Sequence, residues 1–149
     1  MKKNILTICI FFFGILFVSG QEQYKLFIAE KSDRPNTEKT HYYILQLVNE
    51  TSSPATFSLN NKKFSCENRD HKQHTDFTFE FYNLNKIQLL GNIIAKKNSS
   101  VKFYLKKIAP DNAIKSSWNC SLIEATNMEN KKVISILMNS LVQDSSRVN

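Results

Sequence analysis

Residues 99–126 read SSVKFYLKKIAPDNAIKSSWNCSLIEAT, and this stretch decides the fold. In its first part Val101, Phe103 and Leu105 alternate with lysine and tyrosine side chains. An apolar set that repeats every second residue predicts a β-strand with one buried and one solvated face. The following polar residues include Pro110, whose fixed φ angle favours a turn. The stretch therefore predicts a strand, a long turn and a second strand, and the rest of the chain is expected to pack against this pair.

The second strand of the pair carries the only tryptophan of the chain. Trp118 and Cys120 share one face of a strand, so we expect both side chains to point inward. Asn119 and Ser121 then take the opposite face. Lysine side chains are expected on solvated faces, where they hinder pairing between exposed strand edges. The paired lysines predicted at turns and on outward faces are at positions 62, 63, 96, 97, 102, 106, 107, 131 and 132.

Other short apolar segments predict further strands. Nearly every side chain in residues 42–48 is apolar, which suits a central strand covered on both faces. In residues 55–59 and 77–82 apolar and polar side chains alternate, and the three phenylalanines of the second segment are expected in the core. Further strands are expected at 24–30 and 133–138, with short pieces near 87–89 and 93–94. About seven to nine strands without helical periodicity predict an all-β sandwich.

Two upstream segments add to the pattern of the central stretch. Residues 43–52, YILQLVNETS, and 54–59, PATFSL, look like an early hairpin, and residues 99–126 add an alternating strand, a proline-containing connection and a Trp-Asn-Cys strand. Together these segments resemble immunoglobulin-like or fibronectin type III-like β-sandwich modules of secreted bacterial proteins, especially those of Bacteroidetes. The resemblance covers residues 42–138. It implies a fold, and folds of this kind carry many functions.

The N-terminus has the pattern of a secretory signal peptide. Lys2 and Lys3 precede an apolar run at 5–18, and residues 18–20 suit a cleavage site. The run is shorter than the roughly 20 residues that span a bilayer, so we expect cleavage before Gln21 and no transmembrane segment after it. The expected location is the periplasm, the cell surface or the exterior of a bacterium. The predicted organisation is a signal peptide at 1–20, a β-sandwich domain at 21–138 and a C-terminal tail at 139–149.

Charge and cysteine content fit an exported domain. The formal charge of +7 falls to +5 without Lys2 and Lys3, and a charge of this size favours solubility before it indicates a partner. Cys66 and Cys120 are the two cysteines beyond the signal peptide, and an even number in an oxidising compartment predicts a disulfide between them. Such a bond stabilises a fold by roughly 4 kcal/mol in the chain-entropy treatment. Two free thiols are the alternative.

The polar segment 60–76 is the candidate binding loop. A loop of this length is uncommon in a compact domain and is often functional. The residues expected to engage a partner are Lys62, Lys63, Arg69, His71, Lys72 and His74. Cys66, His71 and His74 could instead bind Zn or Cu through one thiolate and two imidazoles, although their spacing matches no recognised metal motif.

No catalytic signature stands out from the sequence. The chain has no G-x-S-x-G elbow, no glycine-rich phosphate loop and no marked pair of carboxylates. We therefore predict an exported, non-enzymatic binding or assembly module of the cell envelope or extracellular space that needs no cofactor. Its expected partner is a protein or a glycan of the envelope, and not nucleic acid. A metal-binding protein that uses Cys66, His71 and His74 is the alternative.

Overall fold

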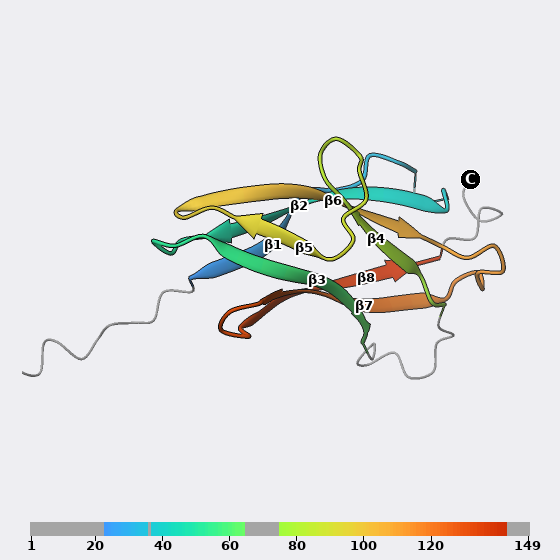
Figure 1. Ribbon diagram of the computed structural model, residues 1–149. Coiled ribbons are helices and arrows are strands. Elements are labelled where there is room, and N and C mark those ends of the chain that lie inside the picture. Colours follow the sequence, from blue (N-terminus) through green and yellow to red (C-terminus); the bar gives the residue numbers. More distant parts are fainter. Residues whose placement is uncertain (1–22, 36, 65–74, 143–149) are drawn as a thin grey trace, which may run out of the picture.

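The computed structural model describes residues 23–35, 37–64 and 75–142, which form an all-β sandwich (Figure 1). No helix in these residues is long and apolar enough to cross a membrane. The predicted signal peptide lies outside them. The strands in this part of the chain are β1 (Tyr24–Glu30), β2 (Thr40–Asn49), β3 (Ala55–Lys63), β4 (Thr78–Tyr82), β5 (Asn92–Ala95), β6 (Ser99–Ile108), β7 (Trp118–Asn127) and β8 (Val133–Leu141).

The strands form two four-stranded antiparallel sheets. The first sheet has the order β1-β2-β6-β4 and the second has the order β5-β3-β7-β8. The sheets lie face to face in two layers, so the apolar face of each is buried against the other. The predicted β-sandwich is confirmed. Its assignment to immunoglobulin-like or fibronectin type III-like modules stays a prediction.

The stretch 99–126 supplies an inner strand to each of the two sheets. β6 lies between β2 and β4 in the first sheet, whereas β7 lies between β3 and β8 in the second. The connection 109–117 therefore carries the chain from one layer to the other. The prediction that these two strands form a pair is wrong, because each of them satisfies its backbone hydrogen bonds on both sides within its own sheet.

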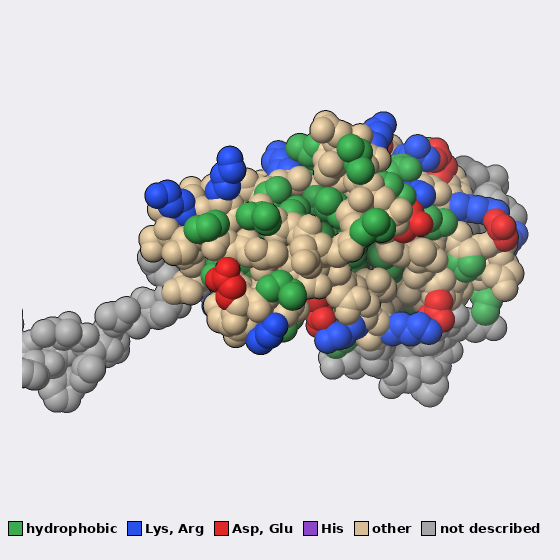
Figure 2. Space-filling model, viewed as in Figure 1, with side chains coloured by type: hydrophobic (Ala, Val, Ile, Leu, Met, Phe, Trp, Pro, Cys, Tyr) green, Lys and Arg blue, Asp and Glu red, His purple; other side chains and the backbone are tan. Residues whose placement is uncertain are grey.

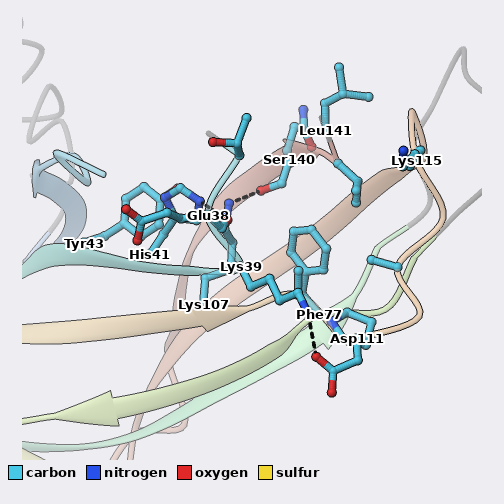
Figure 3. Close-up of a pocket in the computed structure, with 16 residues that line it drawn as sticks. Glu38, Lys39, His41, Tyr43, Phe77, Lys107, Asp111, Lys115, Ser140 and Leu141 are labelled. Atoms are coloured by element: carbon cyan, nitrogen blue, oxygen red, sulfur yellow. Dashed lines mark hydrogen bonds and ion pairs between the residues drawn. The ribbon is translucent and has the colours of Figure 1, made fainter. Parts of the chain in front are cut away.

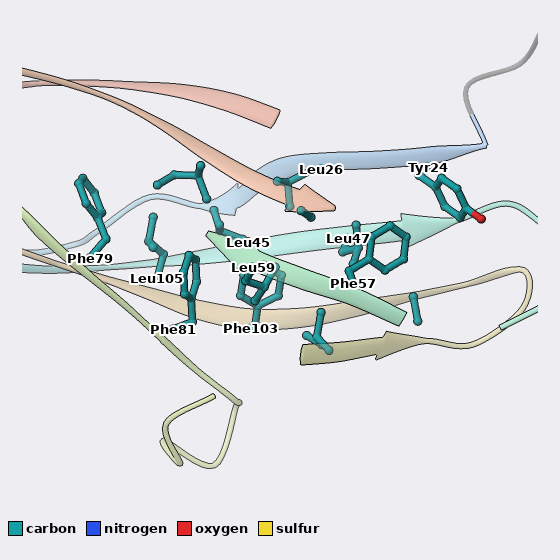
Figure 4. Close-up of a cluster of buried hydrophobic side chains, with 14 of the residues drawn as sticks. Tyr24, Leu26, Leu45, Leu47, Phe57, Leu59, Phe79, Phe81, Phe103 and Leu105 are labelled. Atoms are coloured by element: carbon teal, nitrogen blue, oxygen red, sulfur yellow. The ribbon is translucent and has the colours of Figure 1, made fainter. Parts of the chain in front are cut away.

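Large apolar side chains from both sheets meet in the core (Figure 4). Phe103 and Leu105 of β6 and Phe57 of β3 are fully buried. The predicted inward face of β6 is thus confirmed. Phe79 and Phe81 of β4 are each 9% exposed and belong to the same cluster, so the alternating phenylalanines are core residues, as predicted.

β7 turns the opposite face to the core from the one predicted. Ile123 is fully buried in the core, and Asn119 lies on the same face of the strand. Trp118 and Cys120 lie on the other face, so the prediction that they point into the core is wrong. Asn119 is tolerated inside because its side-chain amide donates a 3.0 Å hydrogen bond to the backbone carbonyl of Thr75.

Cys120 is buried on the outer side of β7. The backbone amide of Phe64 donates a 2.9 Å hydrogen bond to the carbonyl oxygen of Cys120, which places the chain two residues before Cys66 beside it. Cys66 itself lies outside the described residues. The Cys66–Cys120 pairing therefore stays a prediction.

β3 is longer than the sequence pattern suggested. It continues to Lys63, into the segment predicted as loop 60–76. The extension forms because these residues pair with β7, and Lys62 makes a 2.8 Å ion pair with the buried carboxylate of Glu124. The predicted loop is therefore shorter at its start than expected.

Two further boundaries and faces differ from the predictions. β8 ends at Leu141, beyond the expected domain boundary at 138, because it follows β7 to the pairing of Leu141 with Trp118.

On the outer face of β2, Tyr42 is 37% exposed. The expectation that this central strand is covered on both faces is wrong, since only its inner face meets the second sheet.

Reduction tests the predicted Cys66–Cys120 disulfide. The intact mass of the exported chain should rise by about 2 Da in reductant, because two thiols replace one S–S bond. Cys66→Ala should lower the free energy of unfolding by roughly 2–4 kcal/mol in chemical denaturation and leave the β-sheet circular dichroism spectrum unchanged. An unchanged mass would rule the bond out.

Candidate functional site

One end of the sandwich contains a cavity of about 370 Å³ (Figure 3). It is surrounded by the β1–β2 loop, the first half of β2, the end of β6, the β6–β7 connection and the end of β8. The antiparallel pairing of His41 with Lys107 brings the contributions of β2 and β6 together. A cavity of this size falls within the range of small-molecule sites.

Lys107 is the central side chain of this cavity. It is only 7% exposed, and its Nζ donates a 3.1 Å hydrogen bond to Ser140 Oγ. The ammonium also lies 5.5 Å from the ring centre of Tyr43 and 5.3 Å from that of Phe77, within the range of cation–π contacts. Within the described part of the chain no carboxylate pairs with it. Burial lowers the pKa of Lys107 to about 8, because desolvation disfavours the charged amine.

The inward position of Lys107 follows from the two-residue period of β6. Phe103 and Leu105 face the core, and the next residue on that face is Lys107. The prediction that this lysine lies outward is wrong for that reason. Its neighbour Lys106 lies on the outer face as predicted, where it makes a 2.9 Å ion pair with Glu80. The parity shared with the apolar residues is the sequence signal that could have located Lys107.

His41 and Tyr43 form the β2 wall of the site. His41 Nε2 lies 2.9 Å from the carbonyl oxygen of Glu38, and its Nδ1 lies 3.2 Å from Ser32 Oγ. Burial, and after it the charge of Lys107, lowers the pKa of His41, whereas burial raises the pKa of Tyr43. Both shifts favour the neutral side chains. The wall beside the ammonium therefore carries no charge near neutral pH.

An ion pair joins the two loops at the rim of the cavity. Lys39 Nζ lies 2.7 Å from Asp111 Oδ1, and the amide of Ala109 donates a 2.8 Å hydrogen bond to the carbonyl oxygen of Lys39. The hydrogen bond from Lys39 lowers the pKa of Asp111. This exposed pair adds little stability, but it holds the β1–β2 loop to the β6–β7 connection. Because Lys39 compensates it, the Asp111 carboxylate does not neutralise Lys107.

The chemistry of the site suits an anionic oxygen group with an apolar body. The Lys107 ammonium supplies charge and hydrogen-bond donors, and the Ser140 hydroxyl beside it can donate or accept. The rings of Tyr43 and Phe77 supply apolar walls. A carboxylate or phosphate at Lys107 would supply the counter-charge that the described protein groups do not, and such charge-assisted hydrogen bonds are strong.

A second and larger hollow, of about 970 Å³, lies on the outer face of the first sheet. The side chains of Tyr42, Tyr82 and Tyr104 line it. Arg34 also lines this hollow. Its guanidinium makes a 2.9 Å ion pair with Glu38 and lies 5.2 Å from the ring centre of Tyr42. Lys31 and Lys86 also line this hollow, together with the carboxylates Glu30, Asp33 and Glu38. Because the protein itself places acids beside these cations, the Lys107 cavity is the stronger candidate for ligand binding.

The residues predicted from sequence to form the binding loop do not line the cavity where they are described. Lys62 pairs with Glu124, and Lys63 makes a 2.6 Å ion pair with Asp76. Within the described residues there is no group of three or more His, Cys, Asp or Glu side chains placed to hold a metal ion. The binding loop and the metal site both stay predictions, since their other members, Cys66, Arg69, His71, Lys72 and His74, lie outside those residues.

Comparison with known proteins identifies a fold and no family. No family model matches the sequence, and no curated protein matches it. The structure is similar to a FixG-related protein from Vibrio parahaemolyticus, with a TM-score of 0.58 and 10% identity over 81% of this chain and 97% of that one. A family 123 glycoside hydrolase from Clostridium perfringens matches with a TM-score of 0.53 and 12% identity, over 81% of this chain and 27% of that one. A conjugative transposon lipoprotein from Bacteroides eggerthii matches with a TM-score of 0.48 and 10% identity, over 80% of this chain and 98% of that one.

At identities of 10–12%, the two likenesses with TM-scores above 0.5 show the fold alone. The chain is a two-sheet β-sandwich. The main feature of its candidate site is Lys107, which is buried in the cavity at one end of the sandwich. The functional argument must rest on that site, because a shared sandwich fold does not transfer a ligand.

Substitution of Lys107 tests whether the site costs stability. Lys107→Met keeps the length of the side chain and removes an ammonium that burial disfavours, so it should raise the free energy of unfolding by about 2 kcal/mol near pH 7. The folded protein releases the Lys107 proton at its pKa of about 8, while the unfolded chain holds the proton up to the ordinary lysine pKa of 10.5. The stability of wild type relative to Lys107→Met should therefore rise between these pH values, as denaturant titrations would show. A constant difference across that range would contradict the shifted pKa.

Proposed function

We propose that this chain is an exported, non-enzymatic binding module of the bacterial cell envelope that holds a small anionic ligand in the Lys107 cavity. The observation that carries the proposal is a buried ammonium, aimed into a cavity, that pairs with no carboxylate in the described structure. A buried cation normally has a partner. Here the ligand provides it. The signal-peptide pattern at 1–20 supports export, and the envelope is the compartment in which such a module meets its ligand.

The ligand is expected to combine a carboxylate or phosphate with a flat or aliphatic body. Lys107 holds the anionic group, with the Ser140 hydroxyl as its neighbour, while the rings of Tyr43 and Phe77 contact the apolar part. The His41 ring nitrogens already face protein oxygens, so His41 shapes the wall and does not act on the ligand. Capture and release, without chemistry on the ligand, is the role that this arrangement supports best.

Binding of benzoate tests the proposed function. Benzoate should raise the melting temperature in proportion to the logarithm of its concentration, because it binds the folded state only. Neutral benzyl alcohol should have little effect, and inorganic phosphate serves as the anion without an apolar body. Lys107→Met should bind benzoate at least about tenfold more weakly in isothermal titration calorimetry. Lys102→Met is the matched control on the same strand, because Lys102 lies on the outer face and is exposed.

A proton signature separates binding at Lys107 from binding elsewhere. An anion beside the ammonium raises the pKa of Lys107 from about 8, so the complex should take up a proton when it forms between about pH 8 and pH 9. Calorimetry in buffers of different ionisation enthalpy measures this uptake, which Lys107→Met should abolish. Equal benzoate affinity in wild type and Lys107→Met would contradict the proposal.

Export is tested on the chain recovered from its own envelope fraction. N-terminal sequencing should begin at Gln21, because the basic and apolar segment before it has the pattern that signal peptidase removes. The precursor with Met1 should be found only inside the cell. A mature chain that retains residues 1–20 would contradict the proposed processing.

A further inference from the structure

The connection between β4 and β5, residues 83–91, presents large apolar side chains to solvent. Leu84 is 51% exposed, Ile87 63% and Leu90 93%. On the strand that follows, Ile94 is 63% exposed. The connection projects from the edge of the sandwich, where the first sheet ends in β4 and the second in β5 (Figure 1). Exposed apolar side chains gathered in one place mark an interaction surface.

The exposure of these side chains is imposed by an ordered backbone. Asn83 Oδ1 accepts 2.9 Å hydrogen bonds from the amides of Asn85 and Ile87, and the Asn83 amide donates a 2.9 Å hydrogen bond to the carbonyl of Ile87. The amide of Leu89 donates a 2.8 Å hydrogen bond to the carbonyl of Phe81, and the Leu89 side chain packs against the core. The connection is thus anchored at one leucine and directs its neighbours outward.

The chain around this connection carries positive charge and no acid. Between Glu80 and Asp111 there is no aspartate or glutamate, while six lysines occur. Lys86 lies within the connection, and Lys96 and Lys97 follow directly after β5. All three are exposed. Figure 2 shows apolar side chains over the connection and β5, with basic and some acidic side chains elsewhere on the same face.

We propose that residues 83–94, together with Lys96 and Lys97, form a surface that docks onto an anionic phospholipid membrane. Leu84, Ile87, Leu90 and Ile94 enter the boundary between headgroups and acyl chains, as the apolar side chains of interfacial segments do. The lysines contact lipid phosphates, to which exposed cations near a membrane are attracted. The surface lies outside the Lys107 cavity, and the inference does not depend on the proposed ligand.

Two observations favour a membrane over a folded partner protein. The apolar side chains project from a loop and line neither of the two cavities described above, as expected for side chains that enter a lipid surface. The charged side chains of residues 81–110 are all lysines, and a run of one sign complements an anionic surface. A lipid surface requires only an apolar tip and a basic surround, and the structure supplies both.

Sedimentation with vesicles tests the membrane surface. The chain from Gln21 on is used, because the apolar run at 5–18 would bind lipid by itself and the eight described strands all lie within the shorter chain. It should partition at least about tenfold more strongly into vesicles of phosphatidylglycerol and phosphatidylethanolamine than into phosphatidylcholine vesicles. Salt at about 0.5 M should remove most of that preference, because it screens the attraction between the lysines and the lipid phosphates.

Ile87→Ser/Leu90→Ser should lower the partition coefficient by about tenfold or more, because it removes the apolar area that enters the membrane. Val133→Ser/Leu137→Ser is the matched control, since these β8 side chains are 49% and 48% exposed on a different surface. It should bind vesicles as wild type does. Circular dichroism and thermal melting verify that both double variants remain folded.

Lys96→Gln/Lys97→Gln tests the charge, with Lys131→Gln/Lys132→Gln as its control. Each lysine near an anionic surface contributes about fivefold, so the first pair should bind anionic vesicles about 25-fold more weakly, while the second should change binding little. The proposal is overturned if wild type does not sediment with anionic vesicles, or if Ile87→Ser/Leu90→Ser binds them equally well. A preference for neutral vesicles would also overturn it.

Discussion

The antiparallel register of β2 on β6 sets the face to which each side chain of these two strands points. The register pairs Leu45 with Phe103 and Tyr43 with Leu105, and two residues further His41 with Lys107. Burial of the apolar side chains on this face stabilises the two strands, because apolar area removed from water drives folding. The same register then carries His41 and Lys107 to the inner face at the open end of the sandwich. The cavity is therefore a direct consequence of how the core is packed.

This arrangement places a cost on the fold at the site. An ammonium buried beside aromatic rings loses hydration, and the Ser140 hydroxyl with the rings of Tyr43 and Phe77 replaces only part of it. Other lysines of the sheet avoid this cost. Lys102 and Lys106 lie on the outer face, where they reach Glu30 of β1 and Glu80 of β4. A group that lowers stability and faces a cavity is explained by binding better than by folding, because stability and function commonly compete at such sites.

The sequence was sufficient to predict the two-sheet architecture and the inner face of β6, because alternation over several residues is a strong signal. It failed for β7, where the apolar Trp118 and Cys120 start on the outer face, and Asn119 occupies the inner one. That inversion depends on the Thr75 carbonyl, which lies 44 residues away in the chain and satisfies the Asn119 amide. Local patterns contain no information on such a contact. The candidate site was missed for a related reason, since a lysine was assumed to lie outward even on the parity of the core.

The acid-free stretch between Glu80 and Asp111 connects the two surfaces proposed for this chain. Without local carboxylates, each of its lysines must find a partner from elsewhere, remain hydrated or meet a ligand. The two-residue period of β6 divides them: Lys106 faces out and pairs with Glu80, whereas Lys107 faces in, where the described residues offer only a hydroxyl and two rings. In the turns around β5 the lysines stay hydrated beside exposed apolar side chains. One compositional bias thus yields an enclosed cation suited to a small anion and an open basic surface suited to an extended one.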